Sequence, residues 1–310
     1  MKLIFMGTPD FSVGTLEALI AAGHEITLVV SQPDKPKGRG HELAPTPVKE
    51  TALKHGLKVF QPKRLRDPET VKTLEETPAD AIVVIAFGQI VPASILHMKK
   101  YGCINVHGSL LPKYRGAAPI QWAVIDGERE SGVTIMQMDE GLDTGDMLLK
   151  GSVVLDEKET SGSLFDKLSA LGASLCVEAL EKLEKGELTP EKQGESPTEY
   201  ARMLTKEMGE LDFSRDAVTL ERLIRGLNPW PSAYTRLGDK TLKIWAADVC
   251  EKQEPESQPG TVTEVAKQDF TVACGEGALK ITELQLQGKK RMDAAAFLRG
   301  YHLEAGMKLG

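Results

Sequence analysis

The first third of the chain alternates short apolar, β-branched runs with amphipathic stretches, and this alternation constrains the fold more than any other feature. Strands are expected at Leu3–Met6, Ile26–Val30, Lys58–Phe60, Ala81–Ala86, Ile104–Val106 and Val133–Met138, and helices at Phe11–Ala22, Val48–Lys54 and Val71–Glu76. Strands that alternate with helices pair in parallel through right-handed crossovers. The pattern therefore predicts an α/β fold with a doubly wound, Rossmann-like parallel sheet.

The sequence pattern of the rest of the chain changes twice, from a long helix to a linker and then to short strands. Ser161–Gly186 carries one apolar stripe at helical spacing and is the clearest helix. Residues 187–208 lose this periodicity and gather Pro, Gly and charges, which is typical of a linker. Beyond a helix at Ala217–Leu227, short strand-like runs separated by Gly and Pro predict a small, OB-like β-barrel. With 310 residues, we expect one domain at 1–186, a linker at 187–208 and a second domain at 209–310.

The turn Met6–Phe11 lies between the first strand and the first helix, where nucleotide-binding loops are found. It has neither the three-glycine dinucleotide fingerprint nor the Gly-Lys-Ser/Thr of a phosphate loop. A tight strand-to-helix turn that forms one wall of a substrate cleft is the favoured interpretation, with a bound dinucleotide as the alternative.

Composition narrows the class of protein. The best candidate for a membrane-spanning segment, Ala79–Phe87, has about half the length of a membrane helix, and Met1–Gly7 lacks the pattern of a secretory signal. The four cysteines are scattered: Cys103, Cys176, Cys250 and Cys274. Their spacing suits neither a zinc site nor a disulfide framework, so we expect reduced thiols, no metal and a cytoplasmic location. The net charge of −7 argues mildly against a nucleic-acid partner, and any such contact has to come from local basic patches.

An amide and an imidazole lie two residues apart at the end of one expected strand. Asn105 and His107 therefore share a face if the strand continues, and Gly108 lets the chain turn past them. Such a pair can donate hydrogen bonds to a developing oxyanion and transfer a proton. A purely structural histidine is the alternative for His107 taken alone.

An acidic loop, Met138–Asp146, follows the next expected strand and carries four carboxylates. A solvated loop or a turn explains this composition equally well. The functional interpretation brings one of these carboxylates beside His107, where it orients the imidazole and the attacking nucleophile.

The two motifs together are more specific than either alone. Asn105, His107 and the run Ser109–Ile120, followed by Asp143 in a Leu-Asp-Thr-Gly-Asp loop, closely resemble the folate-dependent formyltransferases. The resemblance implies that Asn105, His107 and Asp143 are catalytic and that 10-formyltetrahydrofolate is the formyl donor. It also implies a set of folate-binding residues: Phe87, Gly88, Gln89, Ile90, Ser109, Leu110, Leu111 and Pro112.

Three features are similar to the branch of that family that formylates initiator methionyl-tRNA. The chain extends beyond the first domain, the basic loop Ser31–Gly40 resembles the insertion that meets the tRNA acceptor end, and Tyr200–Lys206 and Gly226–Pro231 match that branch. The residues expected to contact tRNA are Lys35, Lys37, Arg39, Lys206, Lys289, Lys290 and Arg291. Lys289–Arg291 fits a solvated turn equally well.

The resemblance implies a reaction in which the α-amino group of methionyl-tRNA attacks the formyl carbon. Asn105 and His107 stabilise the oxyanion, and Asp143 positions His107 and helps to move the amine proton. Two alternatives stay open: a formyltransferase that acts on an amino-sugar nucleotide, and a non-catalytic protein that binds tRNA or folate. We expect a monomer, because no segment suggests a self-complementary face.

Overall fold

A computed structural model describes residues 1–37, 42–251 and 256–310 of the chain. Its contacts divide the chain into two compact units. Unit 1 comprises Met1–Pro119, Glu130–Val154 and Phe165–Ala201, and unit 2 comprises Ile120–Arg129, Leu155–Leu164 and Arg202–Gly310. The division of function between the expected domains at 1–186 and 209–310 stays a prediction.

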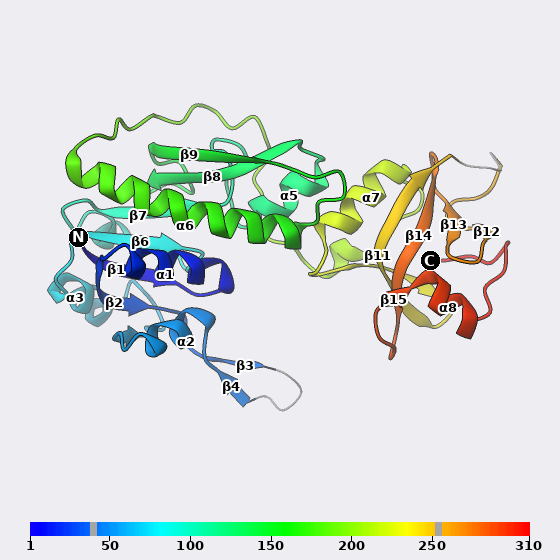
Figure 1. Ribbon diagram of the computed structural model, residues 1–310, viewed down its shortest axis with the longest axis horizontal. Helices are drawn as coiled ribbons and strands as arrows, with labels where there is room; N and C mark the ends of the chain where they lie inside the picture. Colours follow the sequence, from blue (N-terminus) through cyan, green and yellow to red (C-terminus); the bar gives the residue numbers. More distant parts are fainter. Residues whose placement is uncertain (38–41, 252–255) are drawn as a thin grey trace. The chain divides into compact units, whose positions relative to one another are not determined.

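Unit 1 is built on a seven-stranded sheet with the order β5-β2-β1-β6-β7-β8-β9 (Figure 1). Its strands are β1 (Lys2–Gly7), β2 (Glu25–Val30), β5 (Val59–Phe60), β6 (Ala81–Ile85), β7 (Cys103–His107), β8 (Glu130–Gln137) and β9 (Met147–Val154). The strands from β5 to β7 in this order pair in parallel, which confirms the Rossmann-like sheet. The carboxyl ends of β1, β6 and β7 therefore meet at one edge.

The last two strands differ from the expected parallel pattern. β8 pairs antiparallel with β7, and β9, which the sequence pattern did not indicate, pairs antiparallel with β8. The loop between β8 and β9 is too short for a crossover, so the chain returns directly beside β8. The connecting loop of this hairpin, which includes Asp143, leaves β8 after Gln137, the residue that pairs with Ile104 of β7.

Helices lie on both faces of this sheet: α1 (Val13–Ala21), α2 (Pro47–Lys54), α3 (Pro68–Glu76), α4 (Ala93–Leu96) and most of α6 (Ser161–Lys185). On one face, Ile4, Ile82 and Cys103 pack with Leu74 of α3 and Ile95 of α4 in a single buried cluster. On the other face, Gly172 of α6 lies against Val106 of β7, so close that an added Cβ would be 3.0 Å from it. Alternate residues of β7 therefore belong to different layers.

A two-stranded ribbon of β3 (Lys35–Lys37) and β4 (Glu42–Ala44) projects beyond the sheet of unit 1 (Figure 1). Its two ends are tied together, because the Ser31 and Thr46 hydroxyls are 2.6 Å apart. Asp34 accepts hydrogen bonds from Lys49 Nζ at 2.6 Å and Gln61 Nε2 at 2.7 Å. These bonds lower the pKa of Asp34, the one from Gln61 most, and the carboxylate forms an ion pair with Lys49 at the base of the ribbon.

Unit 2 contains a six-stranded antiparallel sheet with the path β10-β11-β14-β13-β12, and β15 pairs with β14. The strands are β10 (Ala233–Leu237), β11 (Lys240–Cys250), β12 (Val262–Val265), β13 (Phe270–Ala273), β14 (Ala278–Leu286) and β15 (Met292–Asp293). The helices α7 (Ala217–Gly226) and α8 (Ala294–Gly300) complete it, with α5 (Pro119–Ile125) contributed largely from an earlier part of the chain. The expected strand-rich second domain is confirmed, and the closure of its sheet into an OB-like barrel stays a prediction. No helix within the described ranges is both long and apolar enough to span a bilayer.

The segment expected to be a linker begins as an ordered part of unit 1. Glu191 exchanges two backbone hydrogen bonds with Met147, of 2.8 and 2.9 Å. Ala201 donates to the Arg115 carbonyl at 2.8 Å and accepts from Ala117 at 2.8 Å. Residues 191–201, named here the strap, thus run alongside the loops that follow β7 and β8.

Candidate active site

Two polar side chains stand at the carboxyl end of β7. Asn105 and His107 are 9% and 6% exposed, and the strand places both on the face opposite Val106. The apolar sequence of the strand keeps it in the centre of the sheet, where β6 and β8 pair with it on either side. The expected neighbourhood of amide and imidazole is therefore present in the fold.

The imidazole of His107 is oriented by the chain that follows it. Its Nε2 lies 3.0 Å from the carbonyl oxygen of Tyr114. Because a carbonyl only accepts hydrogen bonds, this contact assigns the proton of a neutral imidazole to Nε2. The other ring nitrogen, Nδ1, then faces the acidic loop with its lone pair available.

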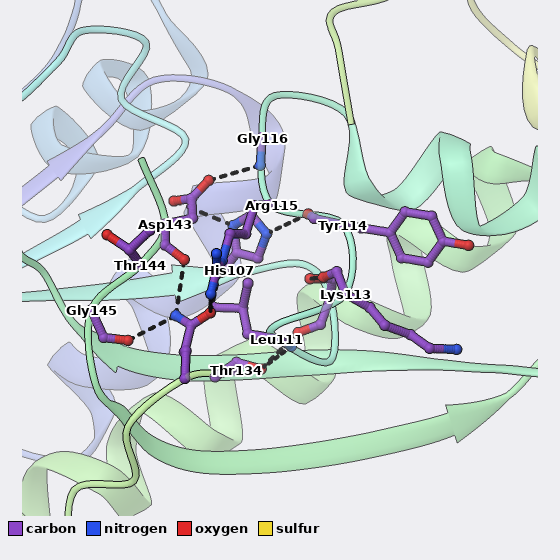
Figure 2. A network of polar contacts seen from close by, with 12 residues as sticks. His107, Leu111, Lys113, Tyr114, Arg115, Gly116, Thr134, Asp143, Thr144 and Gly145 are labelled. Carbon is purple, nitrogen blue, oxygen red and sulfur yellow. Dashed lines mark hydrogen bonds and ion pairs between the residues drawn. The ribbon is translucent and has the colours of Figure 1, made fainter. Parts of the chain in front are cut away.

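Asp143 is the carboxylate of the acidic loop that lies beside His107 (Figure 2). Its Oδ1 is 3.8 Å from His107 Nδ1, and its Oδ2 accepts a hydrogen bond of 2.9 Å from the backbone N–H of Gly116. A separation of 3.8 Å is too long for a direct hydrogen bond. A small movement of either side chain when a substrate binds would bring the two groups within the distance that proton transfer needs. The φ of Asp143 is +56°, a left-handed conformation that most side chains avoid.

Of the three expected catalytic side chains, Asn105 is the one without a hydrogen-bond partner in the described part of the chain. It makes no side-chain hydrogen bond to any residue in the described part of the chain, although the residue is largely buried. An amide with open donor capacity at the end of a strand can bind a ligand oxygen. Asn105, His107 and Asp143 together offer a donor, a proton carrier and a carboxylate within one unit.

The expected folate segment after β7 is held by a hydroxyl of β8. Thr134 is fully buried and donates to the Ser109 carbonyl at 2.7 Å. The same hydroxyl accepts from the Leu111 N–H at 3.0 Å. Thr134 thus fixes the backbone of Ser109, Leu110, Leu111 and Pro112, which includes a cis peptide bond before Pro112.

The expected folate segment after β6 lies at the neighbouring strand end. The Phe87 carbonyl accepts from Thr8 Oγ1 at 3.0 Å and from Gln32 Nε2 at 3.2 Å, so the loops after β1, β2 and β6 are joined. Gly88 turns the chain with a φ of +87°, and Ile90 is 78% exposed. Gln89 and Ile90 line a cavity of about 620 Å³ together with Lys63 to Arg66. A cavity beside the strand ends is where ligands of such sheets bind.

Comparison with known proteins identifies the family of the chain. The formyl transferase family model matches residues 1–180, and the model for the formyl transferase C-terminal domain matches residues 203–302. The chain belongs to the formyl transferase family. It is 60% identical to the methionyl-tRNA formyltransferase of Lachnospira eligens over the full length of both chains. It is 58% identical to that of Agathobacter rectalis, over 99% of this chain and 98% of the relative.

Solved structures agree with the fold. An N-formyltransferase from Helicobacter canadensis, in complex with folinic acid and dTDP-3-aminofucose, has a TM-score of 0.67 at 18% identity, covering 91% of this chain and 98% of its own. HypX from Aquifex aeolicus in complex with tetrahydrofolic acid has a TM-score of 0.63 at 19% identity, covering 99% of this chain and 50% of its own. At such identities the likeness shows the fold alone.

The basic residues expected to contact tRNA in unit 1 belong to the β3–β4 ribbon. Lys35 is exposed at the start of β3, and Lys37 ends that strand. Arg39 lies outside the described residues. The ribbon carries an exposed apolar side chain as well, since Leu43 is 70% exposed. Lys35 and Lys37 therefore both belong to this projecting ribbon.

The basic residues expected to contact tRNA in unit 2 differ in whether their side chains interact with other residues of the unit. Lys206 is exposed just before a 3-10 turn, and Lys289 and Lys290 are exposed between β14 and β15. Arg291 instead donates two hydrogen bonds of 2.6 Å to Glu283 and lies 4.7 Å from the ring centre of Trp245. The carboxylate of Glu283 raises the pKa of Arg291. The Arg291 side chain thus interacts within unit 2, whereas Lys206, Lys289 and Lys290 are exposed to solvent.

The cysteines take no part in this site. All four are free thiols, and burial raises the pKa of Cys103 and of Cys176 to about 12. Both are therefore neutral core residues. Across residues 1–37, 42–251 and 256–310, no group of three or more His, Cys, Asp or Glu is arranged to hold a metal ion.

Several residues that shape the site carried no recognisable signal. Thr134 lies in an apolar strand, and Gln193 lies in the segment without periodicity. Tyr114 and Gly116 act through backbone groups, which do not depend on the type of side chain. Only Gly116 offers a clue, because its φ of +124° and an added Cβ 2.7 Å from the Ala201 carbonyl demand glycine.

Proposed function

We propose that this protein transfers the formyl group of 10-formyltetrahydrofolate to the α-amino group of initiator methionyl-tRNA and so supports translation initiation. The observation that carries the proposal is the 60% identity, over the full length of both chains, to a methionyl-tRNA formyltransferase. The grouping of Asn105, His107 and Asp143 in unit 1 supports it with a chemical arrangement suited to formyl transfer.

The nucleophile needs little activation. An α-amino group has a pKa of about 8, so a useful fraction is neutral at physiological pH. Its nitrogen forms a bond to the formyl carbon, and the formyl oxygen becomes a tetrahedral oxyanion. The Asn105 amide donates a hydrogen bond to that oxygen, and the His107 imidazole beside it helps to stabilise the developing charge. One such donor lowers the barrier by about 3 kcal/mol.

The second half of the reaction moves a proton. The amine loses a proton as the new carbon–nitrogen bond forms, and the folate nitrogen gains one as its bond to the formyl carbon breaks. Asp143 accepts the amine proton and returns it to the folate nitrogen, directly or through water. The Gly116 N–H, at 2.9 Å, keeps the second oxygen of the carboxylate engaged while the first is used.

The folate lies along Ser109–Pro112 and Phe87–Ile90, at two neighbouring strand ends. The tRNA is bound by the β3–β4 ribbon with Arg39, and by Lys206, Lys289 and Lys290, and residues 209–310 form the tRNA-binding domain. The four free thiols fit a reducing cytoplasm. We expect the enzyme to act as a monomer without a metal.

A transfer assay with parallel acceptors tests the proposal. Labelled 10-formyltetrahydrofolate is supplied with methionyl initiator tRNA, free methionine, glycinamide ribonucleotide or a UDP-amino-sugar. We expect label on the methionyl-tRNA alone. Label on the amino-sugar instead would replace the acceptor while keeping the catalytic trio, and no transfer to any acceptor would favour a binding protein.

A further inference from the structure

Gln193 of the strap connects the Asp143 loop to the loop that follows β7. Its Nε2 donates to the backbone carbonyl of Asp143 at 2.9 Å and to that of Gly145 at 2.7 Å. Its Oε1 accepts from Arg115 Nε at 3.0 Å and from Arg115 Nη2 at 2.8 Å. The half-buried Gln193 side chain therefore donates hydrogen bonds to one loop of the site and accepts them from another.

The Asp143 loop needs such a restraint. Asp143 is held at a φ of +56°, and a Cβ added at Gly145 would be only 1.8 Å from the Gln137 carbonyl. The loop is thus confined on one side and strained at the residue that carries the carboxylate. A small relaxation of the Asp143 backbone moves Oδ1 relative to His107 Nδ1, from which it is now 3.8 Å.

The far end of the restraint is itself anchored. Arg115 Nη2 also donates to the Gly194 carbonyl at 2.9 Å. The guanidinium therefore forms hydrogen bonds with two consecutive residues of the strap, Gln193 and Gly194. The Arg115 carbonyl accepts from Ala201, and Tyr114 N–H donates to Thr198 Oγ1 at 2.7 Å. The same short loop supplies the Tyr114 carbonyl to His107 and the Gly116 N–H to Asp143.

We propose that Gln193 is a positioning residue for formyl transfer, which sets the placement of the Asp143 carboxylate relative to His107 through the Asp143 and Gly145 backbone. Gln193 touches neither ring nor carboxylate and is not a catalytic residue. The inference rests on the proposed function for its kinetic readout. A displacement of about 1 Å at a reacting group costs up to a hundredfold in rate, so the loss of Gln193 lowers kcat about tenfold or more.

The kinetic test compares Gln193→Ala with the wild-type enzyme and with Glu195→Ala. Glu195 is exposed on the same strap and makes no side-chain hydrogen bond or ion pair within the described ranges, so its loss is the matched control. We expect Gln193→Ala to lower kcat about tenfold, with both KM values and the melting temperature close to those of the control. A kcat within about twofold of the control would overturn the inference.

Gln193→Glu separates the two ends of the amide. A carboxylate keeps the pairing with Arg115 but places an acceptor against the carbonyls of Asp143 and Gly145, which also only accept. We expect this variant to be at least as slow as Gln193→Ala. Wild-type turnover would mean that Gln193 serves only to hold Arg115, and would refute a role at Asp143.

A double-mutant cycle with Asp143→Asn distinguishes positioning from general stability. If Gln193 acts through the carboxylate, Gln193→Ala slows the Asp143→Asn enzyme less than about twofold further. An undiminished tenfold loss in that background would show that Gln193 acts elsewhere and would overturn the inference.

Hydrogen exchange provides a readout that does not depend on the acceptor. We expect the amides of residues 141–146 to exchange faster in Gln193→Ala than in Glu195→Ala, with the core strands unchanged. Unchanged exchange in this loop would overturn the inference. A wild-type enzyme that fails to formylate methionyl-tRNA would overturn the proposed function instead, and exchange would still decide the role of Gln193.

Discussion

Replacing Thr134 with Val removes a hydroxyl that ties the expected folate segment to β8. The two side chains have nearly the same shape, so the change deletes hydrogen bonds without creating a large cavity. It leaves the buried N–H of Leu111 and the buried carbonyl of Ser109 without the partner they have at 3.0 and 2.7 Å. Each buried polar group left unpaired costs about 1–3 kcal/mol, so we expect a loss of roughly 2–4 kcal/mol in the unfolding free energy of unit 1.

Thermal denaturation measures this cost. For a unit of this size, each kcal/mol lowers the melting temperature by roughly 2–4 °C, so the melting temperature of unit 1 in Thr134→Val should fall by about 5–15 °C. Because Ser109 to Pro112 lose their restraint, the KM for 10-formyltetrahydrofolate should rise about tenfold, while the KM for methionyl-tRNA stays nearly constant. The rise follows from a loss of preorganised binding.

Thr134→Ser is the matched control, because it keeps the hydroxyl and loses only a methyl group. That loss costs about 1 kcal/mol and leaves both hydrogen bonds in place. Thr134→Val should therefore be the less stable of the two variants and should alone raise the KM for folate. Equal melting temperatures together with equal KM values would refute the reasoning.

Three further predictions concern other parts of the chain. Gly116→Ala places a Cβ 2.7 Å from a backbone carbonyl of the strap and displaces the N–H bonded to Asp143, so kcat should fall about tenfold or more in steady-state assays. Arg291→Ala breaks the paired hydrogen bonds to Glu283, so calorimetry should show destabilisation of unit 2, and a salt-dependent loss of tRNA affinity without destabilisation would contradict this. Asp216→Ala removes the N-cap of α7 and should cost about 1 kcal/mol at neutral pH. Its hydrogen bonds to Thr219 lower the pKa of Asp216, so its contribution is complete above the ordinary value of 3.8 and disappears as the pH falls below it, which denaturation at several pH values would reveal.

The elements that local sequence pattern predicts are those whose apolar spacing is set by the core. β6 is continuously apolar because both of its faces are covered, and α6 carries one stripe because one side packs on the sheet. β9 escaped prediction because Gly151 and Lys150 interrupt its apolar run, and its burial alternates only in the second half. Without β9, the direction of β8 could not be inferred from the sequence.

The residues of the candidate site also differ in how far their proximity could be predicted from the sequence. Asn105 and His107 are two residues apart on one strand, so their proximity follows from strand geometry. Asp143 is 36 residues further along the chain and was placed beside them only through the family resemblance. Gln193 is separated from Asp143 by 50 residues and lies in a segment without periodicity, so only the three-dimensional structure reveals the contact.

The most direct test of the catalytic account is the single-turnover rate of formyl transfer with both substrates saturating, measured for Asn105→Ala, His107→Ala and Asp143→Ala. Each variant removes a group assigned to the transition state, so the account predicts a loss of roughly a hundredfold or more in every case, with both dissociation constants nearly unchanged. A near-normal rate in any one of them would contradict the role given to that residue, and near-normal rates in all three would place the chemistry elsewhere.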